Sequence, residues 1–413
     1  MGWLLCFCRG RQTTNRLARR LYFPYGRERN LEAAMRILLA LLGSVLIVGI
    51  LWEGFETVIF PRRVTRRLRL TRLFYRSTWL LWSGLIGRIF SGKRQEALFG
   101  VYGPISLFLL LIVWAAGMIT GFALIYWASA TPLHTPEGDA GFFAALYFSG
   151  STFFTLGLGD VRAFTTWGRT LTVLEAGVGF GFLALVIAYL PALNQSFSRR
   201  EVSVSLLDAR AGSPPTAFEM LRRHGHDHAL AALQQLLYEW EQWSAEFLEI
   251  HLSYPVLAYF RSQHDNQSWL GALTAILDTC ALVAMGIEGA CERQARLTFA
   301  MARHAVVDLA LIFGTPPGKE EQERLPSPLL QALRQNLAEA GLKLQEGVAV
   351  DQSLAELRAM YEPYLHALSR YFHIALPPWM AEGQADNWQR SKWEQIATIA
   401  SLRRRGRARD RHF

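Results

Sequence analysis

The segment Thr155–Asp160 reads Thr-Leu-Gly-Leu-Gly-Asp, and its residue types suit the transfer of an ion out of water. An ion that crosses lipid must exchange its water shell for other oxygens. A ring of backbone carbonyls supplies them if successive carbonyls point the same way. Gly157 and Gly159 stand at alternate positions, and glycine accepts the left-handed backbone conformations that such a strand requires. Thr155 adds a hydroxyl at the inner mouth, and the Asp160 carboxylate just outside attracts cations. We interpret this segment as a candidate ion filter.

Irregular backbone is tolerated at membrane depth only where protein or water surrounds it, so helices must enclose the filter. Residues 140–154 are apolar with small residues and predict a short helix leading into it. Uncharged residues 97–128 precede this helix, and residues 170–193 follow the filter with Glu175 as their only charge. Both exceed the roughly 20 residues that span a bilayer, and the first is long enough to predict tilt or an interfacial start. The alternative is an ordinary glycine-containing loop. It does not explain why a span, a short helix, the glycine motif and a second span follow one another in the chain.

A further membrane span is predicted within residues 33–60. Ile37 to Trp52 is uncharged, and the apolar character continues to Phe60. Residues 1–32 form a basic, irregular amino-terminal segment, without the small-residue cleavage site that marks a removable signal peptide. Met35 stands just before the apolar run and is an alternative start of the chain.

Residues 61–96 form a basic segment, with seven arginines and no acid between Arg62 and Arg76. We favour an amphipathic cytoplasmic or interfacial segment in contact with membrane lipids, anionic ones included. The alternative is a voltage-sensing helix, because three of the arginines recur every third residue, but Pro61 and the lack of a long apolar span oppose it. The predicted lipid contacts are Arg62, Arg63, Arg66, Arg67, Arg69 and Arg72.

The basic loops predict the topology, because basic residues collect on the cytoplasmic side of membrane proteins. With residues 62–94 in the cytoplasm, 97–128 runs outward and 170–193 returns inward, which leaves the amino terminus outside. Residues 9–36 are also basic and conflict with that placement, unless the chain starts near Met35. In the alternative, residues 73–90 cross the membrane and the arginines lie outside. The net charge of +9 thus fits a multi-pass protein of the bacterial inner membrane better than a nucleic-acid-binding protein.

Residues 196–413 are predicted to form a helical cytoplasmic domain with a basic tail. Apolar residues at helical spacing predict helices at 230–251, 269–312, 328–347 and 354–374. Glycine and proline clusters predict breaks at 212–215, 314–318 and 377–378. This half contains no phosphate-binding glycine loop after a strand and no nucleophile–base motif. We expect no enzyme activity and no cofactor other than the permeant ion.

Two polar clusters in this half each allow two interpretations, a functional site or an ordinary solvated segment. His224, His226, Asp227 and His228 could bind a metal or sense pH, or form an ordinary turn. The arginine-rich tail Arg403–Arg411 suggests either contact with anionic lipid or disorder.

Residues 97–195 resemble the pore domain of potassium channels, with an outer helix, a pore helix, a filter and an inner helix. The filter motif resembles the family's Thr-Val-Gly-Tyr-Gly-Asp, and Trp167-Gly168-Arg169 resembles the Trp-Gly-Arg that often follows it. The whole resembles bacterial one-pore-loop ion channels with an extra amino-terminal helix, which implies an all-α membrane protein. A single filter strand cannot surround an ion, and the chain has one copy, so the resemblance implies a homotetramer.

The resemblance also assigns roles to individual residues. It implies that potassium binds the backbone of Thr155, Leu156, Gly157 and Leu158. Residues predicted to support the filter are Tyr147, Phe148, Ser151, Thr152 and Glu175, and Glu175 is expected to bond pore-helix hydroxyls such as that of Thr152. A gating hinge is predicted at Gly177, Gly179, Gly181 and Pro191. The alternatives are close helix packing through the glycines and a simple end of the span at the proline.

Three departures from the family pattern bear on ion selectivity. Leu158 replaces the usual tyrosine, whose hydroxyl tethers the filter to pore-helix aromatics. Phe154 replaces a second threonine, and Ser151 stands where some members carry a glutamate that pairs with the filter aspartate. Three hypotheses follow: a potassium channel, a weakly selective cation channel, and a non-conducting membrane receptor or scaffold. The sequence identifies no gating ligand.

Overall fold

The computed structural model describes residues 25–59, 70–129, 131, 133–135, 141–224, 229–264, 266–287, 291–318 and 323–381. The chain divides into two compact units. The first comprises residues 1–53 and 111–185, and the second comprises residues 54–110 and 186–413. Helices α3 (Lys93–Ala128) and α5 (Thr166–Ala211) each run from one unit into the other.

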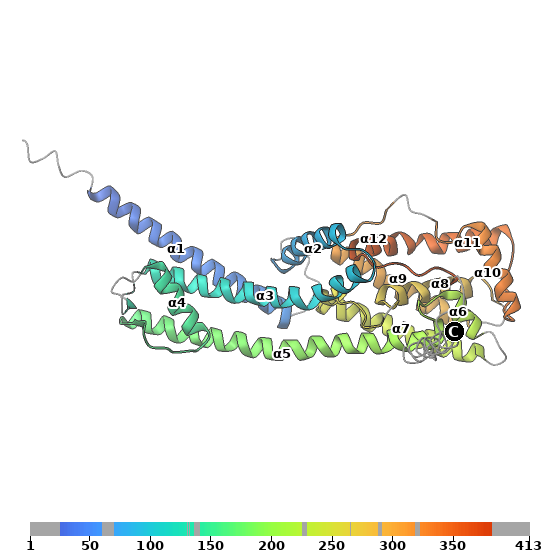
Figure 1. The fold of residues 1–413 in the computed structure, drawn as a ribbon, viewed down its shortest axis with the longest axis horizontal. Coiled ribbons are helices and arrows are strands. Elements are labelled where there is room, and N and C mark those ends of the chain that lie inside the picture. Colours follow the sequence, from blue (N-terminus) through green and yellow to red (C-terminus); the bar gives the residue numbers. More distant parts are fainter. Residues whose placement is uncertain are drawn as a thin grey trace, which may run out of the picture. The chain divides into compact units, whose positions relative to one another are not determined.

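The first unit holds the predicted membrane and pore elements (Figure 1). Helix α1 (Tyr25–Gly54) precedes α3 in the chain, and α4 (Phe142–Phe153) lies between α3 and α5. The π-helical turn η1 (Phe55–Ile59) continues α1 and falls in the second unit. Strand β1 (Leu133–His134) pairs antiparallel with β2 (Arg162–Ala163). Leu31–Val58, α3 and α5 are each long and apolar enough to cross a membrane, as the sequence predicts. Apart from this pair of two-residue strands, the described residues form an all-α membrane protein.

Glycines bring α1 and α3 close together within the first unit. A Cβ atom built on Gly43 would lie 2.5 Å from the carbonyl oxygen of Gly121, and one on Gly117 would lie 2.4 Å from Ile50. Membrane helices have no strong hydrophobic force between them in lipid, so close backbone approach through small residues supplies packing instead. These contacts fix the extra amino-terminal helix against the outer helix of the pore.

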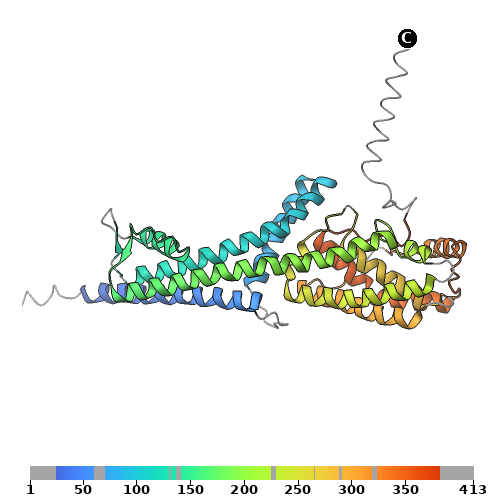
Figure 2. The ribbon, with the colours of Figure 1, turned by 90° about the horizontal axis from the view of Figure 1, so that it is seen from below.

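The second unit is a helical assembly, in which α7, α8 and α9 lie side by side (Figures 1 and 2). All 16 residues of α8 are buried, so this helix forms the core that the other helices surround. Besides α3, α5 and η1, this unit contains α2 (Leu70–Ile89), α6 (Ala217–Arg223), α7 (Ala229–Ser253), η2 (Pro255–Tyr259), α8 (Trp269–Ala284), α9 (Glu292–Phe313), α10 (Ser327–Glu339), α11 (Val348–Ala359) and α12 (Glu362–Phe372).

Several predicted helix boundaries were wrong. The helix predicted at 269–312 is two helices, because the chain turns after Ala284 and Gly286 adopts a left-handed φ of 109°. The helix predicted at 328–347 ends at Glu339, and the one at 354–374 is split between α11 and α12. The inner span was predicted at residues 170–193, and the helix that contains it, α5, continues to Ala211 with Pro191 inside it. Pro191 therefore does not terminate this helix.

Helix α2 packs against the charged helical unit, which argues against the alternative that residues 73–90 cross the membrane. Tyr75, Trp79, Ser83 and Ile86 make its buried face, and the Trp79 indole N–H donates to the Tyr371 carbonyl at 2.8 Å. The start of α3 packs in the same unit, where a Cβ on Gly103 would meet the Phe260 ring at 2.6 Å. Residues 97–104 thus account for the excess length of the uncharged stretch.

A buried ion network connects the carboxyl-terminal helices. The Arg324 guanidinium donates to both carboxylate oxygens of Asp278, at 3.2 and 2.7 Å, and to Glu362 at 3.2 Å. Tyr361 donates to Asp278 at 2.7 Å, and Asp278 is 1% exposed. Burial raises the pKa of Glu362, while Arg358 beside it lowers that pKa. Charges this deeply buried are stable only while each keeps its partner.

We predict that Arg324→Met destabilises the second unit by about 3–5 kcal/mol, because it leaves Asp278 buried and unpaired. The matched control is Arg296→Met, which removes an ion pair to Glu292 whose side chains are 63% and 58% exposed. Exposed pairs of this kind contribute about 0–1 kcal/mol. The measurement is the unfolding temperature of the detergent-solubilised full chain, and equal shifts for the two variants would contradict the network's role.

Candidate ion filter

The pore helix α4 leads directly into the predicted filter. Its end is closed by two turn hydrogen bonds, from Thr155 N–H to the Thr152 carbonyl at 2.9 Å and from Leu156 N–H to the Ser151 carbonyl at 2.8 Å. These bonds satisfy the last carbonyls of the helix, which would otherwise have no partner. The chain can then leave the helix as irregular backbone without orphaned polar groups at that point.

The filter backbone alternates in the way that the sequence predicts. Thr155, Gly157 and Gly159 have positive φ angles of 56°, 60° and 79°. Glycine adopts these angles at no steric cost, but a β-branched residue does so rarely, at a cost of order 1–3 kcal/mol. The left-handed conformation of Thr155 was not predicted, and it extends the alternation one residue beyond the glycines.

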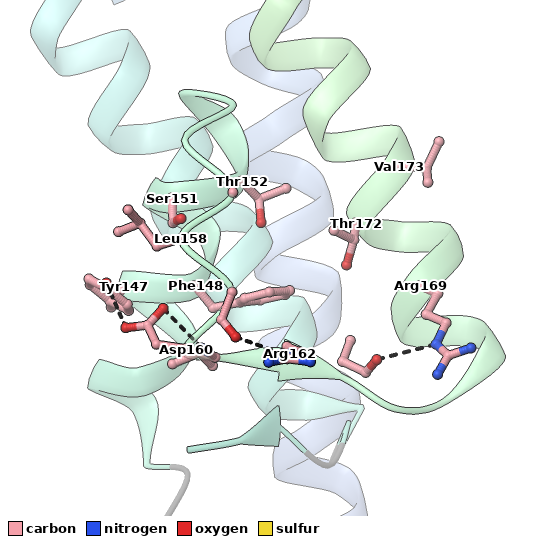
Figure 3. Close-up of a pocket in the computed structure, with 14 residues that line it drawn as sticks. Tyr147, Phe148, Ser151, Thr152, Leu158, Asp160, Arg162, Arg169, Thr172 and Val173 are labelled. Carbon is pink, nitrogen blue, oxygen red and sulfur yellow. Dashed lines mark hydrogen bonds between the residues drawn. The ribbon is translucent and has the colours of Figure 1, made fainter. Parts of the chain in front are cut away.

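Hydrogen bonds hold the outer end of the filter (Figure 3). The Tyr147 hydroxyl donates to Asp160 Oδ2 at 2.8 Å, and the Val161 N–H donates to Asp160 Oδ1 at 3.0 Å. The Tyr147 hydrogen bond lowers the pKa of Asp160 below its ordinary value, so the carboxylate is charged at neutral pH. Arg162 Nε donates to the Gly159 carbonyl at 2.6 Å. The mouth thus carries one carboxylate and one guanidinium.

Glu175 lies behind the filter and joins three helices of the first unit. Its side chain is fully buried. Tyr126 of α3 donates to Glu175 Oε2 at 2.9 Å, and Ser149 of α4 donates to Oε1. A pore-helix hydroxyl was expected here, with Thr152 given as the example, and the pore-helix hydroxyl that bonds Glu175 is that of Ser149, one turn earlier. Ser149 lies on the face of α4 that meets α5, so its hydroxyl is the one that reaches the carboxylate.

Gly179 lies where α5 touches the end of the pore helix. A Cβ on Gly179 would lie 1.9 Å from the Phe153 carbonyl oxygen, which is an impossible contact. Gly177 and Gly181 meet nothing within 4 Å in the described chain. The close-packing alternative therefore applies at Gly179, whereas the hinge stays a prediction for the other two glycines and for Pro191.

The flank of the filter is open in the single chain. A hollow beside it is lined by the pore helix, the filter and α5, and includes Tyr147, Ser151, Thr152 and Val173 (Figure 3). The apolar side chains of Leu156 and Leu158 are 61% and 60% exposed.

The remaining predicted residues lie apart from the filter or outside the described part. Arg72 is exposed on α2. The ring of His224 bonds the Met220 carbonyl at 2.7 Å. Within the described ranges, histidine, cysteine and carboxylate side chains form no metal-binding group. The predictions for Arg62, Arg63, Arg66, Arg67, Arg69, His226, Asp227, His228 and the tail Arg403–Arg411 lie outside the described residues.

Three residues of the site were missed by the sequence analysis. Tyr126 and Ser149 hold Glu175, and Arg162 holds the Gly159 carbonyl. A buried carboxylate needs donors, so Glu175 itself was a signal to search the facing helices for hydroxyls. Arg162 carries a signal too, since it stands two residues after the filter aspartate.

Comparison with known families supports this interpretation of the geometry. Residues 107–195 match the family model described as ion channel. The predicted resemblance to potassium-channel pore domains is thereby confirmed over these residues, and the described fold is that of a membrane protein with a channel-type pore domain.

The chain is also similar to a Bacillus subtilis (strain 168) protein named "Uncharacterized membrane protein YdjJ". The two are 26% identical over 217 residues, which are 51% of this chain and 60% of that protein. The chain thus covers less than two thirds of that relative. No solved structure matches the chain at a significant level.

We predict that Gly179→Ala destabilises the first unit by about 1–3 kcal/mol, because the added methyl group forces α5 away from Phe153. Gly181→Ala, two residues along the same helix, meets open space in the single chain and serves as the control. The readout is the unfolding temperature of the purified protein in detergent. Equal temperatures for the two variants would show that the close contact does not exist.

We predict that Ser149→Ala lowers stability by about 1.5–3 kcal/mol, because it removes a hydrogen bond to a buried carboxylate. Thr152→Val, one turn along α4, removes a hydroxyl that does not bond Glu175 and is expected to cost less. Thermal unfolding of both variants checks this ranking. If Thr152→Val is the more harmful change, the carboxylate is held as the sequence first suggested.

Proposed function

We propose that this protein is a homotetrameric cation channel that conducts potassium through the backbone of Thr155–Leu158. The observation that carries the proposal is the alternating left-handed backbone at Thr155, Gly157 and Gly159. Such alternation turns successive carbonyl oxygens toward one side, where they can replace the water shell of an ion. The match of residues 107–195 to an ion-channel family points the same way.

Four copies follow from the shape of the filter. One strand presents oxygens on one side only, so an ion needs further strands around it. The exposed Leu156 and Leu158 side chains and the exposed α5 residues Val173 and Phe180 lie where neighbouring copies would pack. A closed ring of identical chains is the usual way to bury such a surface.

Potassium is the first choice of ion, and weak selectivity among cations is the second. Leu158 has no hydroxyl to tether the strand, which favours a less rigid filter. The Tyr147 hydroxyl bonds Asp160 at the mouth and so supports the strand from its end rather than at its middle. The charged Asp160 favours cations over anions in either case.

The membrane setting is proposed from the same arrangement. The channel lies in the bacterial inner membrane, with the second unit in the cytoplasm and the amino terminus outside. Basic residues of the 61–96 segment contact anionic lipid.

The inner helix α5 gates the pore, and Gly177, Gly181 and Pro191 are the positions where it can bend. The permeant ion is the only bound group required, and the protein has no enzyme activity.

We predict that the purified protein in liposomes passes potassium in an ion-swap experiment. Replacing internal potassium by sodium is expected to reduce flux strongly if the filter is selective, and little if it is weakly selective. Gly157→Val removes the left-handed position and is expected to abolish flux while the protein still assembles. Absence of flux for any cation under every condition tried would contradict the proposal and favour a non-conducting membrane scaffold.

A further inference from the structure

Helix α2 presents an apolar face that points away from the second unit. Five leucines on it are between 55% and 74% exposed. At about 100° of rotation per residue, they share the side of the helix opposite the buried Trp79. These residues are Leu70, Leu73, Leu80, Leu81 and Leu85, and together they are called here the leucine face.

The charged residues of α2 are all arginines. Arg72, Arg76 and Arg88 are exposed on α2, and the sequence has no acidic residue between Glu56 and Glu96. A helix with one apolar face and basic flanks suits the boundary between lipid headgroups and acyl chains. Two copies that met through this face would bring like charges together, so it is poorly suited to self-association.

The connections of α2 keep it close to a membrane surface. Its first residue, Leu70, follows the candidate span Leu31–Val58 by eleven residues. Its last residue, Ile89, is separated from α3 by three residues. Because basic segments next to spans lie on the cytoplasmic side, the surface in question is the inner leaflet.

The opposite face of α2 is fixed to a short segment that we call the η2 junction, residues 254–261. The Trp79 ring packs on Tyr259 of this junction at 5.3 Å between centroids, and on Tyr102 of α3 at 4.8 Å. Thr78 shares a hydrogen bond with the Tyr102 hydroxyl at 2.9 Å. A displacement of α2 therefore acts directly on the η2 junction.

The inner helix α5 is hydrogen-bonded to the same η2 junction. Arg200 of α5 is 2% exposed, and it donates to the Leu257 carbonyl at 2.7 Å and to the Phe260 carbonyl at 2.8 Å. It also pairs with Glu201 at 2.9 Å. The Phe260 ring in turn contacts Gly103 of α3. Both helices that continue into the pore are thus held by the η2 junction within the second unit.

We propose that the leucine face docks on an inner leaflet containing anionic lipid, and that this contact regulates the pore through the η2 junction and Arg200. The regulatory part rests on the proposed channel function, whereas the docking part does not. When lipid binds α2 and displaces it, Trp79 moves with α2 and displaces the η2 junction. The buried Arg200, which bonds the junction, transmits this displacement to α5. Removal of anionic lipid would relax the same chain of contacts.

Docking is tested by lipid quenching in the full-length protein. A single cysteine at Leu81 or, as a control, at the 84%-exposed Val348 of α11 carries an environment-sensitive fluorophore. The background replaces the four native cysteines and must keep the parent's unfolding temperature. In vesicles of phosphatidylcholine with phosphatidylglycerol, we expect spin-labelled lipid to quench the Leu81 probe several-fold more than the Val348 probe.

Two results of this experiment would overturn docking. A Leu81 probe that aqueous iodide quenches as strongly as the Val348 probe would place the leucine face in water. A probe shielded from both quenchers would assign the face to another copy of the chain. Neither result depends on ion flux, so docking and channel function can fail separately.

Regulation is tested by potassium flux in vesicles with and without phosphatidylglycerol. We expect several-fold higher flux with the anionic lipid, and loss of that difference in the double variant Leu81→Glu with Leu85→Glu.

The Arg200→Lys variant retains the charge but cannot donate to both the Leu257 and the Phe260 carbonyl in the same way, so we expect a weaker lipid dependence of flux. Arg199→Lys, its exposed neighbour, is the control. If flux is the same with and without anionic lipid while spin-labelled lipid quenches the Leu81 probe, regulation is contradicted and docking is retained.

Discussion

Backbone polar groups at membrane depth have no water to bond, and this constraint governs the arrangement of the first unit. The filter leaves helical geometry at Thr155, so each polar group around it needs a partner from protein or from an ion. Turn bonds close the pore helix, and Tyr147 and Arg162 hold the outer end of the candidate filter. In the proposed channel, the carbonyls between these points are the oxygens that bind the cation.

The same constraint explains the packing behind the filter. The pore helix can present its end to α5 only because Gly179 has no side chain, and a methyl group there would overlap the Phe153 carbonyl. Glu175 would be costly in such a place without donors, and hydroxyls from Tyr126 and Ser149 supply them from two other helices. Close approach and buried hydrogen bonds therefore position the candidate filter strand.

The sequence predicted the elements that have long, regular signals, such as the three spans, the pore helix and the alternation at Gly157 and Gly159. It failed where a short tertiary contact decides the outcome. The sequence predicted that a pore-helix hydroxyl bonds Glu175, but not that it is the Ser149 hydroxyl, because composition does not determine the rotation of α4 relative to α5. The 269–312 helix is interrupted at residues where apolar spacing continues, so periodicity alone conceals the turn at Gly286. The continuation of α5 beyond the predicted span at 170–193 was not predicted, because charged residues follow that span, whereas in the structure Arg200 is buried within the second unit.

The central claim is that one chain provides a quarter of the ion-coordinating surface. Native mass spectrometry of the detergent-extracted full-length protein tests this most directly, since one chain has a mass of 46.7 kDa. The account predicts a complex of four times that mass, which loses single chains on activation in the gas phase. A protein that stays monomeric or dimeric in mild detergent, and in lipid nanodiscs where detergent cannot dissociate it, would contradict the account.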